Sequence, residues 1–250
     1  MTRSDRIAAW LRERAEAASA RGFILGMSGG IDSAVVARLC QMAMPDRVLG
    51  VIMPCYSGPQ DERDALIAAD ASGLPVARVD LASAYDAITL DITAASVDAA
   101  RQGFTTDAAR VKLAQANVKP RLRMTTLYTM GTAAGLLVVG TGNRSEIAIG
   151  YYTKYGDGGV DLLPIGALVK SEVRELAREL GVPAPVIDKP PSAGLWAGQT
   201  DEGEMGFTYD ELQRFIESGA SSVPAETAAR IQRLIDASDH KRALPPIGPR

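Results

Sequence analysis

Short apolar segments alternate with longer amphipathic segments through the first 150 residues of the chain. The apolar segments have the length of β-strands, and the segments between them follow the 3.6-residue period of α-helices. We expect strands at residues 23–27, 47–53, 75–79 and 136–140. Strands separated by helices usually pair in parallel through right-handed crossovers. The pattern therefore predicts an α/β fold with a Rossmann-like, doubly wound and mostly parallel sheet that has helices on both faces.

The remaining segments are predicted to be helices and two notable loops. We expect helices at residues 4–20, 32–44, 60–72, 83–99, 107–133, 143–150, 170–180, 208–217 and 224–237. A Gly-rich loop covers 155–161, and a long loop rich in Gly and Pro covers 188–206. Long loops without secondary structure are often functional. The second loop is thus a candidate lid, with an idle surface insertion as the alternative.

The direction of the strands predicts where a ligand binds. In open parallel sheets, ligands bind beyond the carboxyl ends of the strands. The loops at 27–33, 54–60 and 141–146 follow the first, second and fourth strands. We expect these three loops to line one crevice.

Length and charge limit the class of protein. A chain of 250 residues suits a single α/β domain over residues 1–250. Its net charge of −3 argues against nucleic acid as the main partner, because phosphate backbones bind basic surfaces. No apolar run approaches the roughly 18–20 residues of a membrane span, and the charged N-terminus lacks the apolar core of a secretory signal. We expect a cytoplasmic protein without a membrane partner.

Histidine and cysteine are scarce, which excludes several chemistries. The chain has one histidine, His240, and two cysteines, Cys40 and Cys55, which form no CxxC pair. A two-histidine metal site, a cysteine-rich zinc site and a disulfide scaffold are thereby disfavoured. An enzyme of this composition would use carboxylates, lysines, backbone amides or a bound cation.

The loop after the first strand has the composition of an anion site. Residues 26–33 read Gly-Met-Ser-Gly-Gly-Ile-Asp-Ser, between a predicted strand and a predicted helix. Glycines let backbone N–H groups converge, and a helix N-terminus adds positive potential. The segment fits neither the Walker A pattern nor GxGxxG. Asp32 is unexpected beside a phosphate: it caps the helix, lies in a solvated turn, or holds a Mg²⁺ ion.

The string SGGIDS resembles the pyrophosphate loop of the N-type ATP pyrophosphatases, which adenylate a carbonyl oxygen before nitrogen or sulfur displaces AMP. Three further blocks resemble the ammonia-dependent NAD synthetases within that group. They are NVKPRLRM at 117–124, GTGNRSE at 140–146 continuing into GYYTKYGDGGVDLLP at 150–164, and KPPSAGL at 189–195 followed by DEGEMG at 201–206. Together with the loop at 26–33, these blocks are spread over nearly the whole chain.

The resemblance implies a function and a set of functional residues. The function is the ATP-dependent amidation of deamido-NAD with ammonia, a C–N ligase reaction that completes NAD biosynthesis, in a homodimer. The implied ATP-binding residues are Gly26, Met27, Ser28, Gly29, Gly30, Ile31, Asp32, Ser33, Thr141, Lys170 and Ser192. Asp32 and Glu146 are the implied Mg²⁺ ligands, and Arg121, Lys154, Asp161, His240 and Lys241 the implied deamido-NAD contacts. Ser28, Lys170 and Asp157 are the implied catalytic residues, with Asp157 near the ammonia site.

The sequence departs from the family pattern in two places, and it leaves other functions open. Gly142-Asn143-Arg144-Ser145 replaces the common Asp-His-Ala-Ala, and Ser192-Ala193-Gly194 replaces Thr-Ala-Asp. A chain of 250 residues has no room for the nitrilase-like glutaminase domain of glutamine-dependent relatives, so free ammonia is the expected nitrogen donor. The alternatives are another amido- or sulfur-transferring ATP pyrophosphatase, or an inactive nucleotide-binding relative.

Overall fold

Four parallel strands form the centre of the molecule. The computed structural model describes residues 1–192 and 200–249. The strands are β1 (Gly22–Gly26), β2 (Val48–Ile52), β3 (Val76–Arg78) and β4 (Leu136–Val138), in the spatial order β3-β2-β1-β4. All three pairings are parallel, with Ile24 of β1 opposite Leu49 of β2 and Val138 of β4. The predicted α/β fold and its four strands are therefore confirmed.

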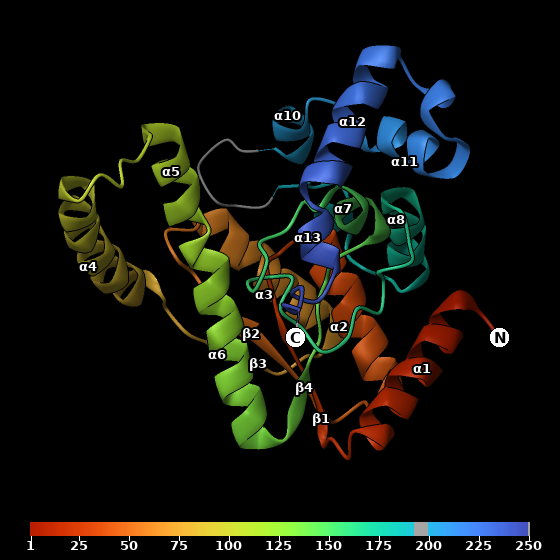
Figure 1. The fold of residues 1–250 in the computed structure, drawn as a ribbon. Helices are drawn as coiled ribbons and strands as arrows, with labels where there is room; N and C mark the ends of the chain where they lie inside the picture. Colours follow the sequence, from red (N-terminus) through yellow and green to blue (C-terminus); the bar gives the residue numbers. More distant parts are fainter. Residues whose placement is uncertain (193–199, 250) are drawn as a thin grey trace.

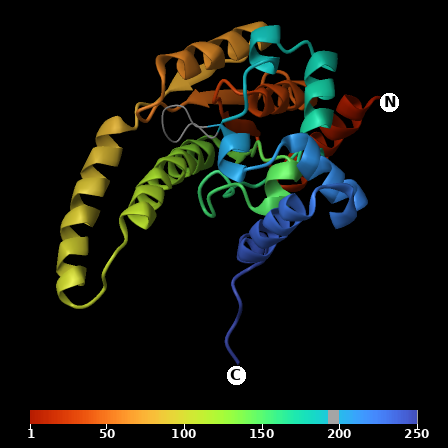
Figure 2. The ribbon, with the colours of Figure 1, turned by 90° about the horizontal axis from the view of Figure 1, so that it is seen from above.

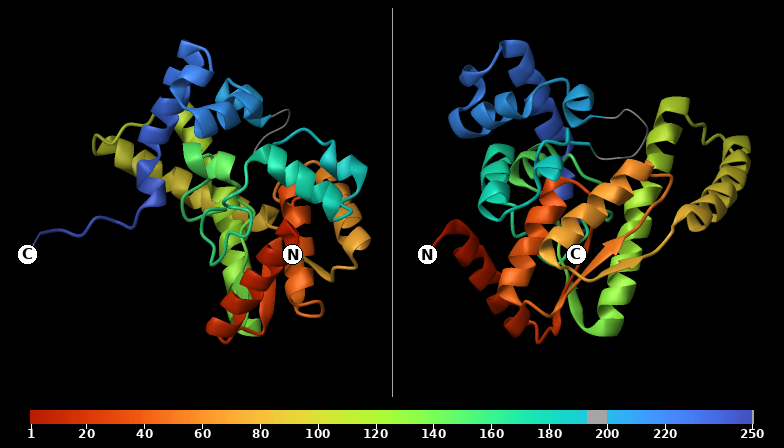
Figure 3. Two further views of the ribbon diagram at one scale, coloured as in Figure 1. Left: turned by 90° about the vertical axis from the view of Figure 1, so that its right-hand side faces the viewer. Right: turned by 180° about the vertical axis from the view of Figure 1, so that it is seen from behind.

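Helices cover both faces of this sheet (Figures 1 and 3). On one face lie α1 (Arg3–Ala17), α2 (Ile31–Ala43), α3 (Pro59–Ser72), α8 (Lys170–Glu179) and the short α9 (Ala184–Ile187). The opposite face is covered by α6 (Val118–Ala134) and the base of α4 (Ala82–Arg101). Alternate residues of β1 serve the two cores: Phe23 and Leu25 enter the first, and Ile24 enters the second.

The segment predicted as one helix over 107–133 is two helices, so that prediction is wrong. The chain forms α5 (Ala108–Ala116) and α6, and it bends at Asn117. Pro120 stands in the first turn of α6 and has no N–H to continue the ladder of α5. The side chain of Asn117 accepts a hydrogen bond from Thr153 Oγ1 at 2.7 Å, which ties the bend to a distant loop.

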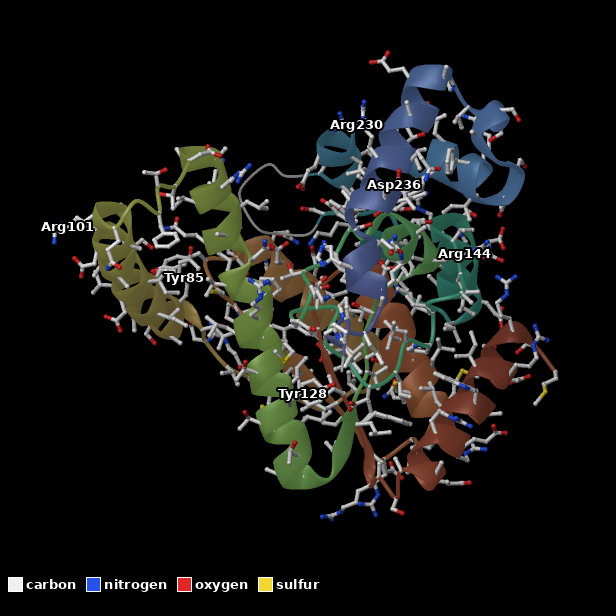
Figure 4. All side chains as sticks on the ribbon, in the orientation of Figure 1. Tyr85, Arg101, Tyr128, Arg144, Arg230 and Asp236 are labelled. Atoms are coloured by element: carbon white, nitrogen blue, oxygen red, sulfur yellow. The ribbon has the colours of Figure 1, made fainter. Side chains whose placement is uncertain are left out.

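Helices α4 and α5 form an arm that projects from the body of the molecule (Figure 2). None of the residues of α4 is buried. Figure 4 shows Tyr85 on the side of α4 toward α6, and Arg101 at the far end of the arm. Several large apolar side chains of the arm are exposed to solvent, namely Ile88, Leu90, Ile92, Val97, Phe104 and Leu113.

The C-terminal helices form a third, smaller core against α7 (Arg144–Ile149). They are α10 (Asp201–Met205), α11 (Tyr209–Ser218), α12 (Ala225–Ala237) and α13 (Asp239–Arg242), with a 3₁₀ turn at Ala220–Ser222. Ile149 of α7 packs with Phe207, Leu212 and Ile231. The prediction of a loop over 188–206 is wrong at its C-terminal end, because α10 forms at Asp201–Met205. Residues 193–199 of that candidate lid lie outside the described residues.

The strand order determines where the site lies. From β1 the chain first winds outward through β2 and β3, and later returns to place β4 on the other side of β1. The connections that follow β1 and β4 therefore run in opposite directions from neighbouring strands. Such a point, where the strand order reverses, is where open parallel sheets bind ligands. Among residues 1–192 and 200–249, the helices are too short or too polar to cross a bilayer.

Candidate functional site

The loop between β1 and α2 is held in shape by its two serines. Ser28 Oγ lies 3.2 Å from Ser33 Oγ and accepts a hydrogen bond from the Gly30 N–H at 3.3 Å. Ser33 Oγ donates to the Gly30 carbonyl at 2.9 Å. Gly29 adopts a φ of +77°, and a Cβ there would lie 2.7 Å from the Asp61 carbonyl oxygen. Only glycine fits this place, between the loop and α3.

The start of α2 offers backbone donors to an anion. No side chain caps this helix, so the N–H groups of its first turn lack the acceptor that a cap would supply. Gly26 ends β1, and the side chains of Met27 and Ile31 pack into the core. Those three predicted ATP-binding residues can therefore contribute backbone only. The predicted anion cradle has the geometry for its role, although its contact with ATP stays a prediction.

A buried lysine joins two carboxylates beside this loop. Lys170, the first residue of α8, has a side chain that is 3% exposed. Its Nζ lies 2.5 Å from Asp32 Oδ2 on α2 and 3.7 Å from Glu146 Oε1 on α7. The structure thus brings together three predicted site residues that are up to 138 positions apart in sequence. Because a buried charge is costly unless paired, these carboxylates stabilise the Lys170 ammonium.

Asn143, which sequence reasoning did not select, fixes the two carboxylates. It is the N-cap of α7, where its side chain and that of Glu146 bond each other's backbone N–H at 3.1 Å. Its Nδ2 also donates to Asp32 Oδ1 at 3.1 Å. Asp32 is therefore neither a cap of α2 nor part of a solvated turn, and both of those alternatives are wrong. The N-x-x-E spacing was a signal for this cap.

The charges of the site perturb one another. Burial and the neighbouring Asp32 carboxylate raise the pKa of Glu146 to about 8. Burial by itself would lower the pKa of the Lys170 ammonium, but Asp32 and Glu146 outweigh burial and raise it. Lys170 therefore stays protonated, while Glu146 holds a proton more readily than an ordinary carboxyl group.

The same two carboxylates have the chemistry of a magnesium site. Oxygen atoms of Asp32 and Glu146 both lie within 4 Å of the single atom Lys170 Nζ, so they can share one cation. The described residues contain no cluster of three His, Cys, Asp or Glu side chains able to hold a metal. Mg²⁺ suits such a pair, because it is commonly bound by one or two carboxylates together with substrate phosphates and water.

A further buried carboxylate, Asp201, lies close to this group and was not anticipated. It begins α10, and its Oδ2 accepts a hydrogen bond from Tyr209 Oη at 2.8 Å, whereas its Oδ1 has no partner among the described residues. Burial raises the pKa of Asp201. Lys170 Nζ lies 5.2 Å from the centre of the Tyr209 ring. The Asp201 N–H also donates to the Pro191 carbonyl at 3.1 Å, which closes the base of the 192–200 segment.

Two other predicted ATP contacts occupy connecting segments. Thr141 is partly buried in the loop after β4, two residues before Asn143. Ser192 is exposed and is the last described residue before the gap. The contacts of Thr141 and Ser192 with ATP remain predictions.

Four of the predicted dinucleotide contacts form one cluster. Arg121 Nη2 donates to the Lys154 carbonyl at 3.3 Å, and Lys154 Nζ donates to the carbonyl of His240. Lys241 Nζ donates to the carbonyls of Gly150 and Tyr152 at 2.7 and 2.6 Å. The His240 side chain is exposed. The cluster is a basic surface beside the Gly-rich loop.

The two acidic residues of that loop are placed differently. Asp161 lies apart from the basic cluster: its carboxylate accepts from the Val138 N–H at 2.8 Å and from Tyr128 Oη at 2.9 Å, which attaches the loop to β4 and α6. Asp157 Oδ1 accepts from the Thr153 N–H at 2.9 Å. Asp157 is exposed by its surface area, whereas desolvation of its carboxylate raises its pKa.

Arg123 of α6 contacts the loop after β2, which contains Cys55. Its guanidinium donates to the Met53 carbonyl at 3.2 Å and to Ser57 Oγ at 3.4 Å, which ties that loop to α6. That the loop shares a crevice with the loops after β1 and β4 stays a prediction. Cys55 is fully buried, and burial raises the pKa of its thiol. Cys40 is a residue of α2 and is buried in the core. Neither thiol has the environment of a reactive thiolate.

Comparison with known proteins gives consistent matches over nearly the full chain. A sequence model of the family described as NAD synthase matches residues 4–245. The NH(3)-dependent NAD(+) synthetase of Carboxydothermus hydrogenoformans is 48% identical over 245 residues, which covers 98% of this chain and 96% of that protein. The protein of the same name from Archaeoglobus fulgidus is 42% identical, covering 97% and 94%.

Solved structures agree with these matches. An NMN synthetase from Francisella tularensis superposes with a TM-score of 0.86 at 37% identity, covering 98% of this chain and 97% of that one. The NH3-dependent NAD synthetase of Campylobacter jejuni gives a TM-score of 0.77 at 28% identity, covering 99% and 98%. A glutamine-dependent NAD+ synthetase from Acinetobacter baumannii gives 0.66 at 27% identity, but only 45% of that chain is covered.

The raised pKa of Glu146 makes the stability of the empty protein depend on pH. The carboxyl group of Glu146 has a pKa of about 8 in the folded protein and 4.5 in the unfolded chain. Between these two pH values, only the folded protein keeps this proton. This contribution to stability is complete below pH 4.5 and is lost as the pH rises through 8. In metal-free protein, the Tm of wild type should therefore fall relative to that of E146Q between pH 5 and 9. Parallel pH profiles of Tm for the two proteins would contradict the assignment.

Proposed function

This chain belongs to the NAD synthase family, and from that premise we propose that it amidates deamido-NAD with ammonia at the expense of ATP, producing NAD, AMP and pyrophosphate. One observation supports the chemistry most directly. The Lys170–Asp32–Glu146 group lies beside the uncapped start of α2, which is a place for a metal-bound triphosphate.

The first step activates the carboxylate of the substrate. A nicotinate oxygen attacks the α-phosphorus of ATP, a P–O bond forms, and the bond to the bridging oxygen of the pyrophosphate breaks. Backbone N–H groups of the 28–33 loop and the Lys170 ammonium stabilise negative charge on the phosphates. Asp32 and Glu146 would hold Mg²⁺, which would stabilise negative charge on the phosphates. Ser28 keeps the loop in shape through its bonds to Ser33 and Gly30.

The second step forms the amide. Ammonia attacks the adenylated carbonyl carbon and the C–N bond forms. AMP leaves with the electrons of the C–O bond, and the nitrogen releases one proton to solvent to give the amide. Asp157 accepts a proton from the incoming ammonium, a role supported by its raised pKa in the Gly-rich loop. Water would destroy the adenylate, so the site must be closed to solvent during this step.

Basic residues near the Gly-rich loop hold the second substrate. Deamido-NAD carries a pyrophosphate and a carboxylate, both of which suit guanidinium and ammonium groups. Arg121, Lys154, His240 and Lys241 form the cluster that would bind these anions. Asp161 orients the loop from its bonds to β4 and α6 and completes the site.

Free ammonia is the proposed nitrogen donor, and residues 1–250 the proposed single catalytic domain. The relatives matched over nearly their whole length are named for NH3 dependence. Sulfur transfer has little support, because burial raises the pKa of both Cys40 and Cys55. The two free thiols are consistent with the reducing cytoplasm, where we place the enzyme.

A second candidate substrate is the mononucleotide of nicotinic acid. The Francisella structure that superposes with a TM-score of 0.86 is named an NMN synthetase. Amidation of nicotinate mononucleotide uses the same two steps and differs only in the size of the acceptor. The acceptor preference is therefore the main question for an activity assay.

We also propose that the enzyme is a homodimer that buries the α4–α5 arm. Leu90 and Phe104 are 70% and 72% exposed, which is unusual for large apolar side chains grouped on one projection. Light scattering should give twice the mass of one chain, 26.4 kDa, and L90E/F104E should halve the measured mass. A wild-type mass of one chain would contradict the dimer.

An assay of nucleotide products tests the proposed function. With MgATP, ammonium and deamido-NAD, the enzyme should release AMP and NAD in equal amounts. Glutamine in place of ammonium should give little product. Replacing deamido-NAD with nicotinate mononucleotide should lower kcat/KM at least tenfold. Formation of NMN at a higher kcat/KM would favour the second candidate, and absence of both amides would contradict the proposed activity.

The proton acceptor is tested by D157N. The asparagine keeps the size of the side chain and can still accept from the Thr153 N–H, but it cannot take a proton. The rate should fall by roughly 10²-fold or more, most strongly at low pH where ammonium predominates. An unchanged rate across the pH range would remove Asp157 from the catalytic residues.

A further inference from the structure

Two carboxylates on α3 lie against the loop proposed to bind phosphate. A Cβ on Gly29 would lie 2.7 Å from the Asp61 carbonyl oxygen and 2.8 Å from Asp64 Cβ, so this turn of α3 touches the loop. Asp64 is only 6% exposed, and Asp61 is partly buried. Two negative charges thus stand next to a place that should receive a triphosphate.

Lys189 pairs with both of these carboxylates. Its Nζ lies 2.9 Å from Asp61 Oδ1 and 2.7 Å from Asp64 Oδ2. The other oxygen of Asp64 accepts a hydrogen bond from Gln60 Nε2 at 2.6 Å. Among the described residues, the ion pairs within 4 Å of Asp61 and Asp64 are those with Lys189. Lys189 comes from the segment after α9, far from α3 in sequence.

We propose that Lys189 is a positioning residue for the triphosphate of ATP, and that it acts by offsetting one of the two negative charges of Asp61 and Asp64. Without the Lys189 ammonium, both carboxylates would repel the β- and γ-phosphates, because only the backbone of Gly29 would lie between α3 and the bound triphosphate. Since Asp64 and Lys189 are shielded from solvent by the surrounding chain, this repulsion would be only partly screened. The proposal rests on the assignment of the 28–33 loop to ATP.

A purely mechanical tether makes a different prediction from charge neutralisation. If Lys189 only fastened its segment to α3, removing the carboxylates would also release the segment, and ATP binding would stay weak. If Lys189 neutralises charge, removing the carboxylates makes the lysine unnecessary. Combining substitutions on the two sides of the ion pair therefore separates the two roles.

Calorimetric titration with Mg²⁺ and a non-cleavable α,β-methylene analogue of ATP is the test, and it needs no turnover. K189M should weaken binding about tenfold or more at low salt, and clearly less at 0.5 M salt. K189R keeps the charge and should bind nearly as wild type does. The triple variant K189M/D61N/D64N should recover affinity to within about threefold of wild type. R178M, which removes an exposed cation distant from the loop, is the matched control.

The outcomes distinguish this inference from the proposed function. Wild-type affinity in K189M, or weak binding that the triple variant does not restore, overturns the role of Lys189 while the ATP site stands. Thermal melts of each variant identify loss of folding, in which case K189Q replaces K189M in the same cycle. Absence of nucleotide binding by wild type contradicts the ATP site itself, and the role of Lys189 with it.

Discussion

The site depends on one buried ammonium group, that of Lys170, held between two carboxylates. Burial of the Lys170 ammonium requires a partner of opposite charge, which Asp32 supplies at 2.5 Å, and the carboxyl group of Glu146 lies 3.7 Å from the same ammonium. Three helices must therefore meet at this point. Asn143 fixes the pair further, because its amide bonds Asp32 and its backbone N–H bonds Glu146. The same arrangement that stabilises the lysine holds the carboxylates ready for a metal.

The parallel sheet explains how three distant segments reach the same point. All four strands run in one direction, so the segments that follow β1 and β4 emerge at one edge. Asp32 and Glu146 each lie in the first turn of the helix that follows, and Lys170 begins α8, which packs against α2. Side chains in first turns face the ligand side of such sheets, where helix N-termini also attract phosphate. The fold therefore places the first turns of α2, α7 and α8 together, and Asp32, Glu146 and Lys170 supply the charges of the site.

Much of the fold followed from local pattern. The four strands were found because short apolar segments bounded by turn residues have few other structures open to them. The break at Asn117 was missed although Pro120 is a local signal for it. The bond from Thr153 that helps to fix the bend comes from a loop far along the chain and leaves no local signal. Short elements such as α9 and α10 were missed as well, since four or five residues give too little periodicity to recognise.

The candidate site was predictable only in part, for a similar reason. The loop at 26–33 has a local signature, and the resemblance to a family selected Lys170 and Glu146. Neither could show that Asn143 bonds Asp32, that Asp201 is buried beside Tyr209, or that Lys189 pairs with Asp61 and Asp64. These contacts join residues from separate helices and loops. Each depends on the completed packing of the chain rather than on its spacing.

We propose that Asp32 and Glu146 hold a divalent cation together with the phosphates of a nucleotide. Electron paramagnetic resonance of Mn²⁺, used in place of Mg²⁺, measures this directly. Wild type should bind one Mn²⁺ per chain tightly only when the non-cleavable ATP analogue is present, and D32N and E146Q should each weaken that binding by at least tenfold. Mn²⁺ binding that is the same in all three proteins, or independent of nucleotide, would contradict the account.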